Sequence, residues 1–99
     1  MKYRLLVRRS AKGDVRSAAR WYELQRPGLG REFVAEVDAA LSRVAENPLQ
    51  CQVLHRETRR AIVHRFPYGL FYRVEGSTIV VFCVSHLHRE PASWKAREA

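Results

Sequence analysis

The spacing of apolar residues changes along the chain, and the changes mark successive structural elements. Residues 3–8 alternate between apolar and mostly basic positions, which is the period-two pattern of a half-buried strand. From Ser10 to about Gln25 apolar residues recur every three or four positions, which predicts an amphipathic helix. Ser10 is a candidate N-cap, and Asp14 lies in the expected first turn, where an acidic side chain favours the helix dipole.

A second, longer helix is expected after the sequence RPGLG. Pro27 cannot continue the first helix, and Gly28 allows the chain to turn. Asn47-Pro48 ends the second helix. Because the turn is short, the two helices are predicted to form an antiparallel hairpin. The apolar stripe of the second helix contains Leu29, Phe33, Val37, Leu41 and Val44, widened by Val34 and Ala40.

The second half of the chain returns to a period of two. Residues 49–58 are expected to form a loop or an irregular strand, and the chain then continues through three strands, 59–66, 70–75 and 78–86. The nearly all-apolar last strand is typical of a central strand or of one covered on both faces. Turns are expected at Pro67-Tyr68-Gly69 and, as a two-residue type II′ loop, at Gly76-Ser77. An irregular tail follows, with a short helix after Pro91.

The resulting order, β-α-α-β-β-β, predicts an α+β fold in which the helical hairpin packs on one face of a twisted, mainly antiparallel sheet. A length of 99 residues and an apolar fraction of 46% are those of one domain, residues 1–99. No long uncharged apolar run is present, and the run Leu5–Val7 is too short for a signal-peptide core, so a cytoplasmic protein is expected. Cys51 and Cys83 show no CxxC pattern and are expected to be small buried hydrophobes.

The charge restricts the partners. Eighteen basic and ten acidic residues give a formal net charge of +8, supplied almost entirely by arginine. Such a surface attracts polyanions: nucleic acid, an acidic peptide, or an enzyme that carries nucleic acid.

Several kinds of catalytic chemistry lack their motifs. His86 and His88 share one face of a strand, but no further ligands follow at zinc-site spacing, so neither a metal nor another cofactor is expected. The chain contains no GxSxG sequence, no GxxxxGK phosphate loop and no paired carboxylates in its strand-rich half.

A basic, histidine-containing group remains in the strand-rich half. Arginines could stabilise the charge that develops in RNA cleavage, and a histidine could move a proton. The same residues could instead form a binding surface, and the residue types favour binding over catalysis. Trp21-Tyr22 is expected to anchor the core rather than stack on bases, and Trp94 to pack the tail onto the domain. The group consists of Arg59, Arg60, His64, Arg65, Arg73, His86, His88 and Arg89.

Three stretches in order, ARWYELQRPGLGREF, RRAIVHRFPYGLFYRV and HLHREPASW, resemble toxins of the ParE branch of the RelE/ParE superfamily, the plasmid-stabilisation proteins. The resemblance covers essentially the whole chain. It implies a type II toxin that is neutralised by a cognate antitoxin, expected to have an acidic tail and to form a hetero-oligomer with the toxin. ParE-like members poison DNA gyrase, whereas RelE-like members cut mRNA on the ribosome.

Residue by residue, the resemblance favours the gyrase branch. Arg89 stands where the mRNA-cutting members carry an arginine at the end of the last strand, and Arg60 could stand for one of their basic strand residues. However, Gly69 replaces the arginine that those members carry directly after the turn tyrosine, here Tyr68. Their C-terminal tyrosine or histidine falls in SWKAREA, which contains neither. No catalytic residue is therefore expected.

Two alternatives stay open: a RelE-like mRNA endonuclease, and a degenerate toxin that only binds its antitoxin. His86 and Arg89 are expected to tie down the tail, with Trp94 as its anchor. An endonuclease would use Arg60, His64, His88 and Arg89. Contacts with the target or the antitoxin are expected from Arg59, Arg60, Arg65, Arg73, His86, Arg89 and Trp94.

Overall fold

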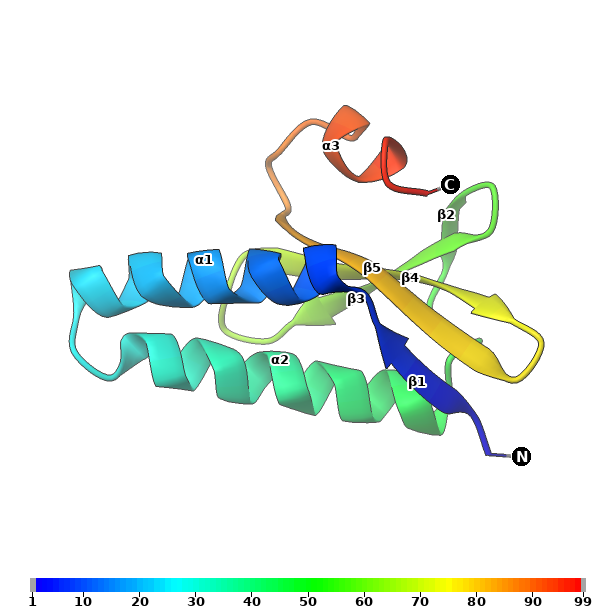
Figure 1. Ribbon diagram of the computed structural model, residues 1–99, viewed down its shortest axis with the longest axis horizontal. Helices are drawn as coiled ribbons and strands as arrows, with labels where there is room; N and C mark the ends of the chain where they lie inside the picture. Colours follow the sequence, from blue (N-terminus) through cyan, green and yellow to red (C-terminus); the bar gives the residue numbers. More distant parts are fainter. Residues whose placement is uncertain (1, 99) are drawn as a thin grey trace.

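A computed structural model describes residues 2–98, and Figure 1 shows a helical hairpin beside a five-stranded sheet. The strand order is β1-β5-β4-β3-β2, with β1 parallel to β5 and the other neighbours antiparallel. The expected α+β architecture is confirmed, with β2 as an additional short strand. The elements are β1 (Arg4–Val7), α1 (Arg9–Gln25), α2 (Leu29–Glu46), β2 (Val53–His55), β3 (Thr58–Val63), β4 (Tyr68–Glu75), β5 (Thr78–His86) and α3 (Ala92–Lys95).

The helical hairpin covers one face of the sheet with the apolar stripe of α2. Phe33, Val37, Ala40 and Val44 are buried there, as the periodicity predicted. From α1 only Ala11 and Ala18 are fully buried, and their small side chains let this helix lie close to the sheet.

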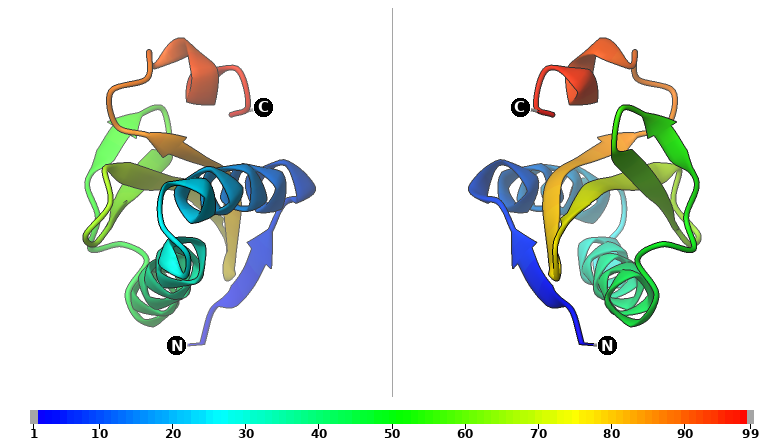
Figure 2. Two further views of the ribbon diagram at one scale, coloured as in Figure 1. Left: turned by 90° about the vertical axis from the view of Figure 1, so that its left-hand side faces the viewer. Right: turned by 90° about the vertical axis from the view of Figure 1, so that its right-hand side faces the viewer.

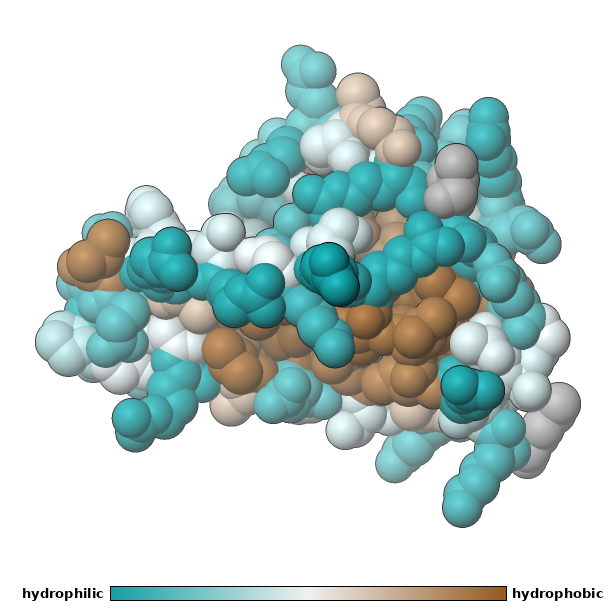
Figure 3. Space-filling view, viewed as in Figure 1, coloured by the Kyte–Doolittle hydropathy of each residue, from teal (hydrophilic) through white to brown (hydrophobic). Residues whose placement is uncertain are grey.

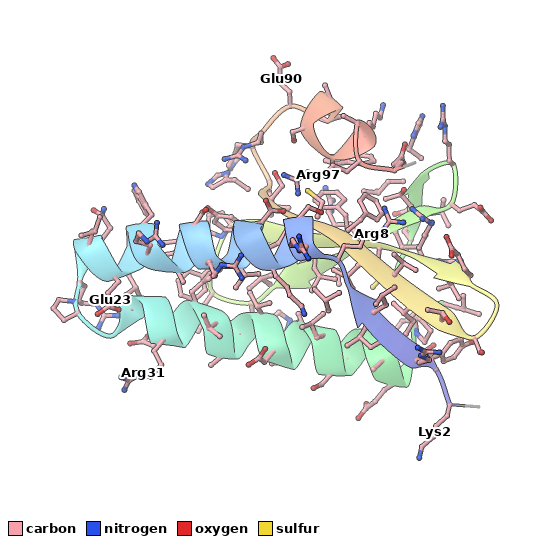
Figure 4. All side chains as sticks on the ribbon, in the orientation of Figure 1. Lys2, Arg8, Glu23, Arg31, Glu90 and Arg97 are labelled. Atoms are coloured by element: carbon pink, nitrogen blue, oxygen red, sulfur yellow. The ribbon has the colours of Figure 1, made fainter. Side chains whose placement is uncertain are left out.

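The turn between the two helices is fixed by a side chain of α1. Gly28 adopts a φ of 90°, in the left-handed region. The Glu23 carboxylate accepts hydrogen bonds from the backbone N–H groups of Gly28 (2.9 Å) and Gly30 (3.1 Å). In Figure 4 Glu23 lies at this turn. Glu23 therefore supplies the cap at the start of α2 that no side chain within α2 provides.

Strand β5 lies between β1 and β4, and a bulge lets it contribute to both faces of the sheet. Phe71 of β4 pairs with Cys83 and the next residue pairs with Val81, so Phe82 is an extra residue in β5. On the face away from the hairpin, Phe71, Phe82, Cys83 and Trp94 form a separate apolar cluster. Figure 2 shows α3 and the hairpin on different sides of β5, with α3 over this second face. Burial raises the pKa of the Cys83 thiol to about 11, so this cysteine stays neutral at pH 7.

The first turns of α1 complete the edge of β5 after β1 has ended. The Ser10 hydroxyl donates to the carbonyl oxygen of Phe82 (3.1 Å), and the backbone N–H of Val84 donates to Asp14 (2.9 Å). The expected roles of Ser10 as N-cap and Asp14 as a first-turn acid are therefore wrong. Arg8 is the N-cap residue and makes no side-chain capping bond, and no acidic residue lies in the first turn. Both side chains serve the sheet, because β5 would otherwise keep unpaired backbone groups.

The turn between β3 and β4 lies earlier than predicted. Strand β3 ends at Val63, the turn occupies residues 64–67, and β4 begins at Tyr68. Arg65 therefore lies in the turn with a φ of 72° rather than on a strand face. Its guanidinium donates to Glu32 (2.6 Å) and forms an ion pair with Glu36 (3.7 Å), both on α2. The two-residue loop at Gly76-Ser77 is confirmed, and Gly76 has a φ of 61°.

Two helical glycines provide opposite tests of this packing. A Cβ added at Gly30 would lie 2.5 Å from the carbonyl oxygen of Ala19, where α1 and α2 approach. A Cβ at Gly13 would meet no atom nearer than an Arg16 guanidinium nitrogen at 3.9 Å. Gly30→Ala should lower the free energy of unfolding by about 1–3 kcal/mol through overpacking. Gly13→Ala should raise it by up to about 1 kcal/mol. Urea denaturation measures both, and equal effects of the two substitutions would contradict the close helix contact.

Candidate functional site

Helix α1 separates two surface hollows of different chemistry. The first lies between α1, α2 and the sheet, has a volume of about 280 Å³, and is mainly apolar with a charged rim. Figure 3 shows an apolar surface beneath α1 that extends towards β1. The lining residues are Val7, Lys12, Val15, Arg16, Val37, Asp38, Leu41, Leu70, Val81 and Val84. This hollow is called the apolar groove below.

The second hollow lies on the other flank of α1, against the ends of β4 and β5. It has a volume of about 690 Å³ and combines aromatic rings with hydrogen-bond donors. Asp14, Ser17, Ala18, Trp21 and Tyr22 line it from α1. Pro67, Tyr68, Val84, His86 and Arg89 line it from the sheet and the turn after β5. This hollow is called the aromatic cleft below.

The floor of the aromatic cleft is held by aromatic rings in edge-to-face and tilted contact. The Tyr68 ring centroid lies 5.0 Å from that of Phe33 and 5.3 Å from that of His86. Tyr22 lies 5.3 Å from Phe33 and contacts Trp21 edge-on at 5.1 Å. Tyr22 is thus an anchor as predicted, but Trp21 is 56% exposed, so its expected place in the core is wrong. Trp21 lies on the same side of α1 as Asp14 and Ser17, which line the cleft, and this side does not face the core.

Burial keeps the tyrosine hydroxyls of the cleft protonated. Burial raises the pKa of Tyr22 above its ordinary value, and the neighbouring Tyr68 adds to the effect. Burial also raises the pKa of Tyr68, and the nearby Arg89 guanidinium opposes this without reversing it. Both phenols are therefore hydrogen-bond donors at neutral pH.

His86 organises the turn that follows β5. Its Nδ1 accepts a hydrogen bond from the backbone N–H of His88 (3.1 Å), and its carbonyl oxygen accepts one from the N–H of Arg89 (3.1 Å). An accepting Nδ1 places the proton of the neutral ring on Nε2. The His88 ring, 5.2 Å from that of His86, is exposed. His86 therefore holds the start of the tail, as expected, and lines the cleft together with Arg89. Among residues 2–98 no side-chain hydrogen bond or ion pair joins Arg89 to the tail, so its expected part in tying down the tail stays a prediction.

The tail is anchored by a buried tryptophan and by two terminal charged residues. The Trp94 ring stacks on Phe71 at 4.8 Å with an interplanar angle of 18°, which confirms that Trp94 packs the tail onto the domain. Arg97 donates to both oxygens of Asp14, at 2.5 and 3.1 Å. This hydrogen bond raises the pKa of Arg97. Figure 4 shows Arg97 beneath the tail, facing the start of α1.

Glu98 anchors the tail at the opposite edge of the sheet. Its carboxylate accepts hydrogen bonds from the Thr58 hydroxyl (2.6 Å) and from the Nδ1–H of His55 (2.9 Å). The Arg73 guanidinium donates to the Glu98 carbonyl oxygen (2.6 Å). Arg97 and Glu98 carry no periodic or motif signal, which is why sequence reasoning missed them.

Most of the expected binding arginines have partners within the protein. Arg59 donates to the carbonyl oxygens of Leu49 (3.1 Å) and Cys51 (2.6 Å), holding the loop before β2. Arg73 pairs with Glu75 and lies over the Phe82 ring at 5.8 Å, besides its bond to Glu98. Together with Arg65, these arginines connect parts of the fold.

The residues that a nuclease would use do not meet in one hollow. Arg60 and His64 line a depression beside the C-terminal end of α2, whereas Arg89 lines the aromatic cleft. Gly69 leaves room for the Arg60 side chain. A Cβ at Gly69 would lie 2.9 Å from the Arg60 Cδ and 3.1 Å from a Leu87 methyl carbon, so the space of a side chain at position 69 is already occupied.

Comparison with known proteins identifies the family. Residues 5–91 match the family described as ParE toxin of type II toxin-antitoxin system, parDE. The chain belongs to the ParE toxin family. No match was found among curated protein sequences. The family match confirms the expectation from the sequence: the chain is a toxin of the RelE/ParE superfamily and belongs to a type II toxin–antitoxin system.

Two solved structures share the ParE-type fold. The chromosomal ParDE toxin–antitoxin system from P. aeruginosa is similar with a TM-score of 0.78 and 17% identity, over 86% of this chain and 96% of that chain. The RelBE2 toxin–antitoxin complex from Mycobacterium tuberculosis is similar with a TM-score of 0.61 and 25% identity, over 87% and 99%.

Residues 2–98 contain no group of three or more His, Cys, Asp or Glu side chains that could hold a metal ion. Within the same range no helix combines the length and the apolar character needed to cross a membrane.

The tail of this ParE-family toxin should respond to acid. Burial would raise the pKa of Glu98, but the hydrogen bonds from Thr58 and His55 outweigh it and lower the pKa below the ordinary 4.5. A lowered folded-state pKa means that the carboxylate stabilises the tail fully above about pH 4.5, and that this contribution is lost as the pH falls through the folded-state value. Trp94 fluorescence in a Trp21→Phe background should therefore change below about pH 4.5 before the global unfolding transition. The Glu98→Gln variant should lack this fluorescence change. If the variant still shows the change, a titrating group other than Glu98 causes it.

Proposed function

We propose that this ParE-family toxin inhibits DNA gyrase and is neutralised by a cognate antitoxin that binds the apolar groove. The choice of gyrase over mRNA as the target rests on one observation: the residues that a nuclease would use lie apart. Arg60 and Arg89 line separate hollows, and the stem of Arg60 fills the space in which an arginine at position 69 would lie. A phosphodiester in RNA needs cations and a proton-transferring group around one reacting centre, and these residues do not supply such a centre.

The apolar groove suits an amphipathic helix of the antitoxin. Val15 and Leu41 are partly buried residues at the groove, so a second apolar surface laid over them would bury further area. Lys12 and Arg16 line the same groove and would attract acidic side chains on that helix. The ParDE system and the RelBE2 complex are both toxin–antitoxin assemblies by description, which supports an antitoxin partner here.

The edge of β1 offers a second contact for the antitoxin. Within residues 2–98, strand β1 pairs only with β5 and is therefore an edge strand. Leu5 and Leu6 on it are 38% and 50% exposed. An extended antitoxin segment that added to this edge would continue the sheet and cover both leucines. Because such segments are often disordered when free, binding would order the antitoxin tail.

The target proposal is tested with purified gyrase. We expect micromolar toxin to inhibit negative supercoiling of relaxed plasmid or to raise gyrase-dependent DNA cleavage, and the purified antitoxin to reverse the effect. The rival activity is measured in parallel by primer extension on translated mRNA. Cleavage sites in that assay, with gyrase unaffected, would replace gyrase by the ribosome as the target. No effect in either assay, with antitoxin binding retained, would indicate a toxin that only binds its antitoxin.

The antitoxin proposal is tested with a matched pair of leucine substitutions. Leu41→Glu places a negative charge in the apolar groove, where it would repel an acidic antitoxin and remove apolar contact. Leu24→Glu makes the same chemical change on α1 at a residue that is 79% exposed and outside the groove. Co-expression with the neighbouring small open reading frame and affinity capture should show at least about tenfold less antitoxin on Leu41→Glu, the size expected from losing one well-buried interface residue. Retention equal to that of Leu24→Glu would place the antitoxin elsewhere.

A further inference from the structure

The aromatic cleft has the composition of a ligand site, and the proposed gyrase and antitoxin contacts do not account for it. Its volume of about 690 Å³ lies within the usual range of small-molecule and cofactor sites. Its residues on α1 follow a helical stripe, Asp14, Ser17, Ala18 and Trp21, so the fold presents them together on one flank of the helix.

An exposed, oriented indole lies at one wall of this cleft. Trp21 is 56% exposed, which is unusual for the largest apolar side chain. The edge-on contact with Tyr22 at 5.1 Å limits the orientations of the indole ring. Tyr22 is in turn held by Phe33 and by Phe66, whose centroid lies 4.8 Å away. A flat ligand could therefore stack on a platform that is already in place.

The opposite wall of the cleft supplies donors for an anion. Arg89 contributes a guanidinium that, among residues 2–98, forms no ion pair. His86 is held with Nδ1 as an acceptor, so the neutral ring offers Nε2–H. Asp14 is the one acidic residue in the lining, and its carboxylate is already bound by Arg97 and by the N–H of Val84.

We propose that the aromatic cleft binds one nucleotide unit of a single-stranded nucleic acid, with the base stacked on Trp21 and a phosphate held by Arg89 and His86. Proteins that bind single strands combine the same two features, an aromatic platform and a positively charged track for the backbone. Arginine is suited to the phosphate because it donates two parallel hydrogen bonds. The formal net charge of +8 would bring a polyanion to this surface.

A nucleic acid fits the cleft better than an acidic peptide does. A carboxylate-rich segment needs several cations and no platform, whereas the cleft pairs Arg89 and His86 with an exposed ring. The apolar groove, on the other flank of α1, has the complementary chemistry for an amphipathic peptide. The two hollows share only Val84 in their linings, so each can be altered without the other.

The experiment measures binding of fluorescein-labelled four-nucleotide oligothymidylate and oligouridylate to the whole toxin by fluorescence anisotropy. Trp21→Ala should weaken binding about tenfold, since it removes the stacking surface from an exposed position that the fold does not need. Arg89→Gln should weaken binding about fivefold and reduce the slope of log K against log salt by about 0.7, the loss of one phosphate contact on a single strand. Thermal unfolding checks that both variants fold.

The matched control is Arg31→Gln, which removes the same charge. Arg31 is an exposed residue of α2, and Figure 4 shows it directed away from α1. We expect its effect to stay below about twofold, because distant exposed charges are screened. Equal weakening by Arg31→Gln and Arg89→Gln would mean that net charge alone binds the strand, and would overturn the proposal.

Two competitors give the remaining outcomes. Unlabelled tripolyphosphate has phosphates without bases, and tetraglutamate with a terminal phenylalanine represents an acidic peptide with an aromatic anchor. The proposal requires that neither displaces the oligonucleotide at equal concentration. Displacement by the peptide would make the cleft a protein-binding site. Displacement by tripolyphosphate would show that phosphate contacts account for the affinity without stacking, and would overturn the proposal. Supercoiling assays on the same variants are a separate readout, so failure here leaves the gyrase proposal standing.

Discussion

The Asp14 carboxylate is the contact through which the helical hairpin, strand β5 and the tail are connected. It accepts the backbone N–H of Val84 on β5 and both guanidinium bonds of Arg97 in the tail. The first of these bonds is required because β1 is too short to pair with the whole length of β5. A backbone N–H left unpaired near the core would cost about 1–3 kcal/mol. The charge-assisted bond from Val84 to Asp14 and the hydrogen bond that the Ser10 hydroxyl donates to Phe82 therefore take the place of the missing strand.

The bulge at Phe82 creates the need for a tail. It places both Phe82 and Cys83 with Phe71 on the face of the sheet that the hairpin does not cover. A sheet that is apolar on both faces must be covered on both faces. Trp94 provides that cover by stacking on Phe71, and Arg97 and Glu98 fasten the segment at opposite sides of the sheet. The bulge in β5 exposes apolar side chains on the second face of the sheet, and the tail covers them.

Periodicity in the sequence was sufficient to predict the helical hairpin and the order of the main elements along the chain, because each of those elements has its own apolar pattern. It failed where a residue acts over a long sequence separation. Ser10 and Asp14 have the local appearance of helix-start residues, yet their partners are about seventy residues away. Arg97 and Glu98 belong to a short tail with too few turns to show a period. Trp21 was assigned to the core by its residue type, although its helical position places it on the flank of α1.

The small residues of α1 explain why this helix has two usable flanks. Ala11 and Ala18 bring the helix axis close to the sheet, so that the residues on either side of this buried line reach the surface. One flank carries Val15 above the apolar groove, and the other carries Trp21 above the aromatic cleft. A helix bound in the groove leaves the cleft on the far side of α1. If both proposed ligands bind as described, an antitoxin can block the cleft only with a segment that crosses α1 or displaces the tail. The contact between Arg97 and Asp14 lies on the second of these routes.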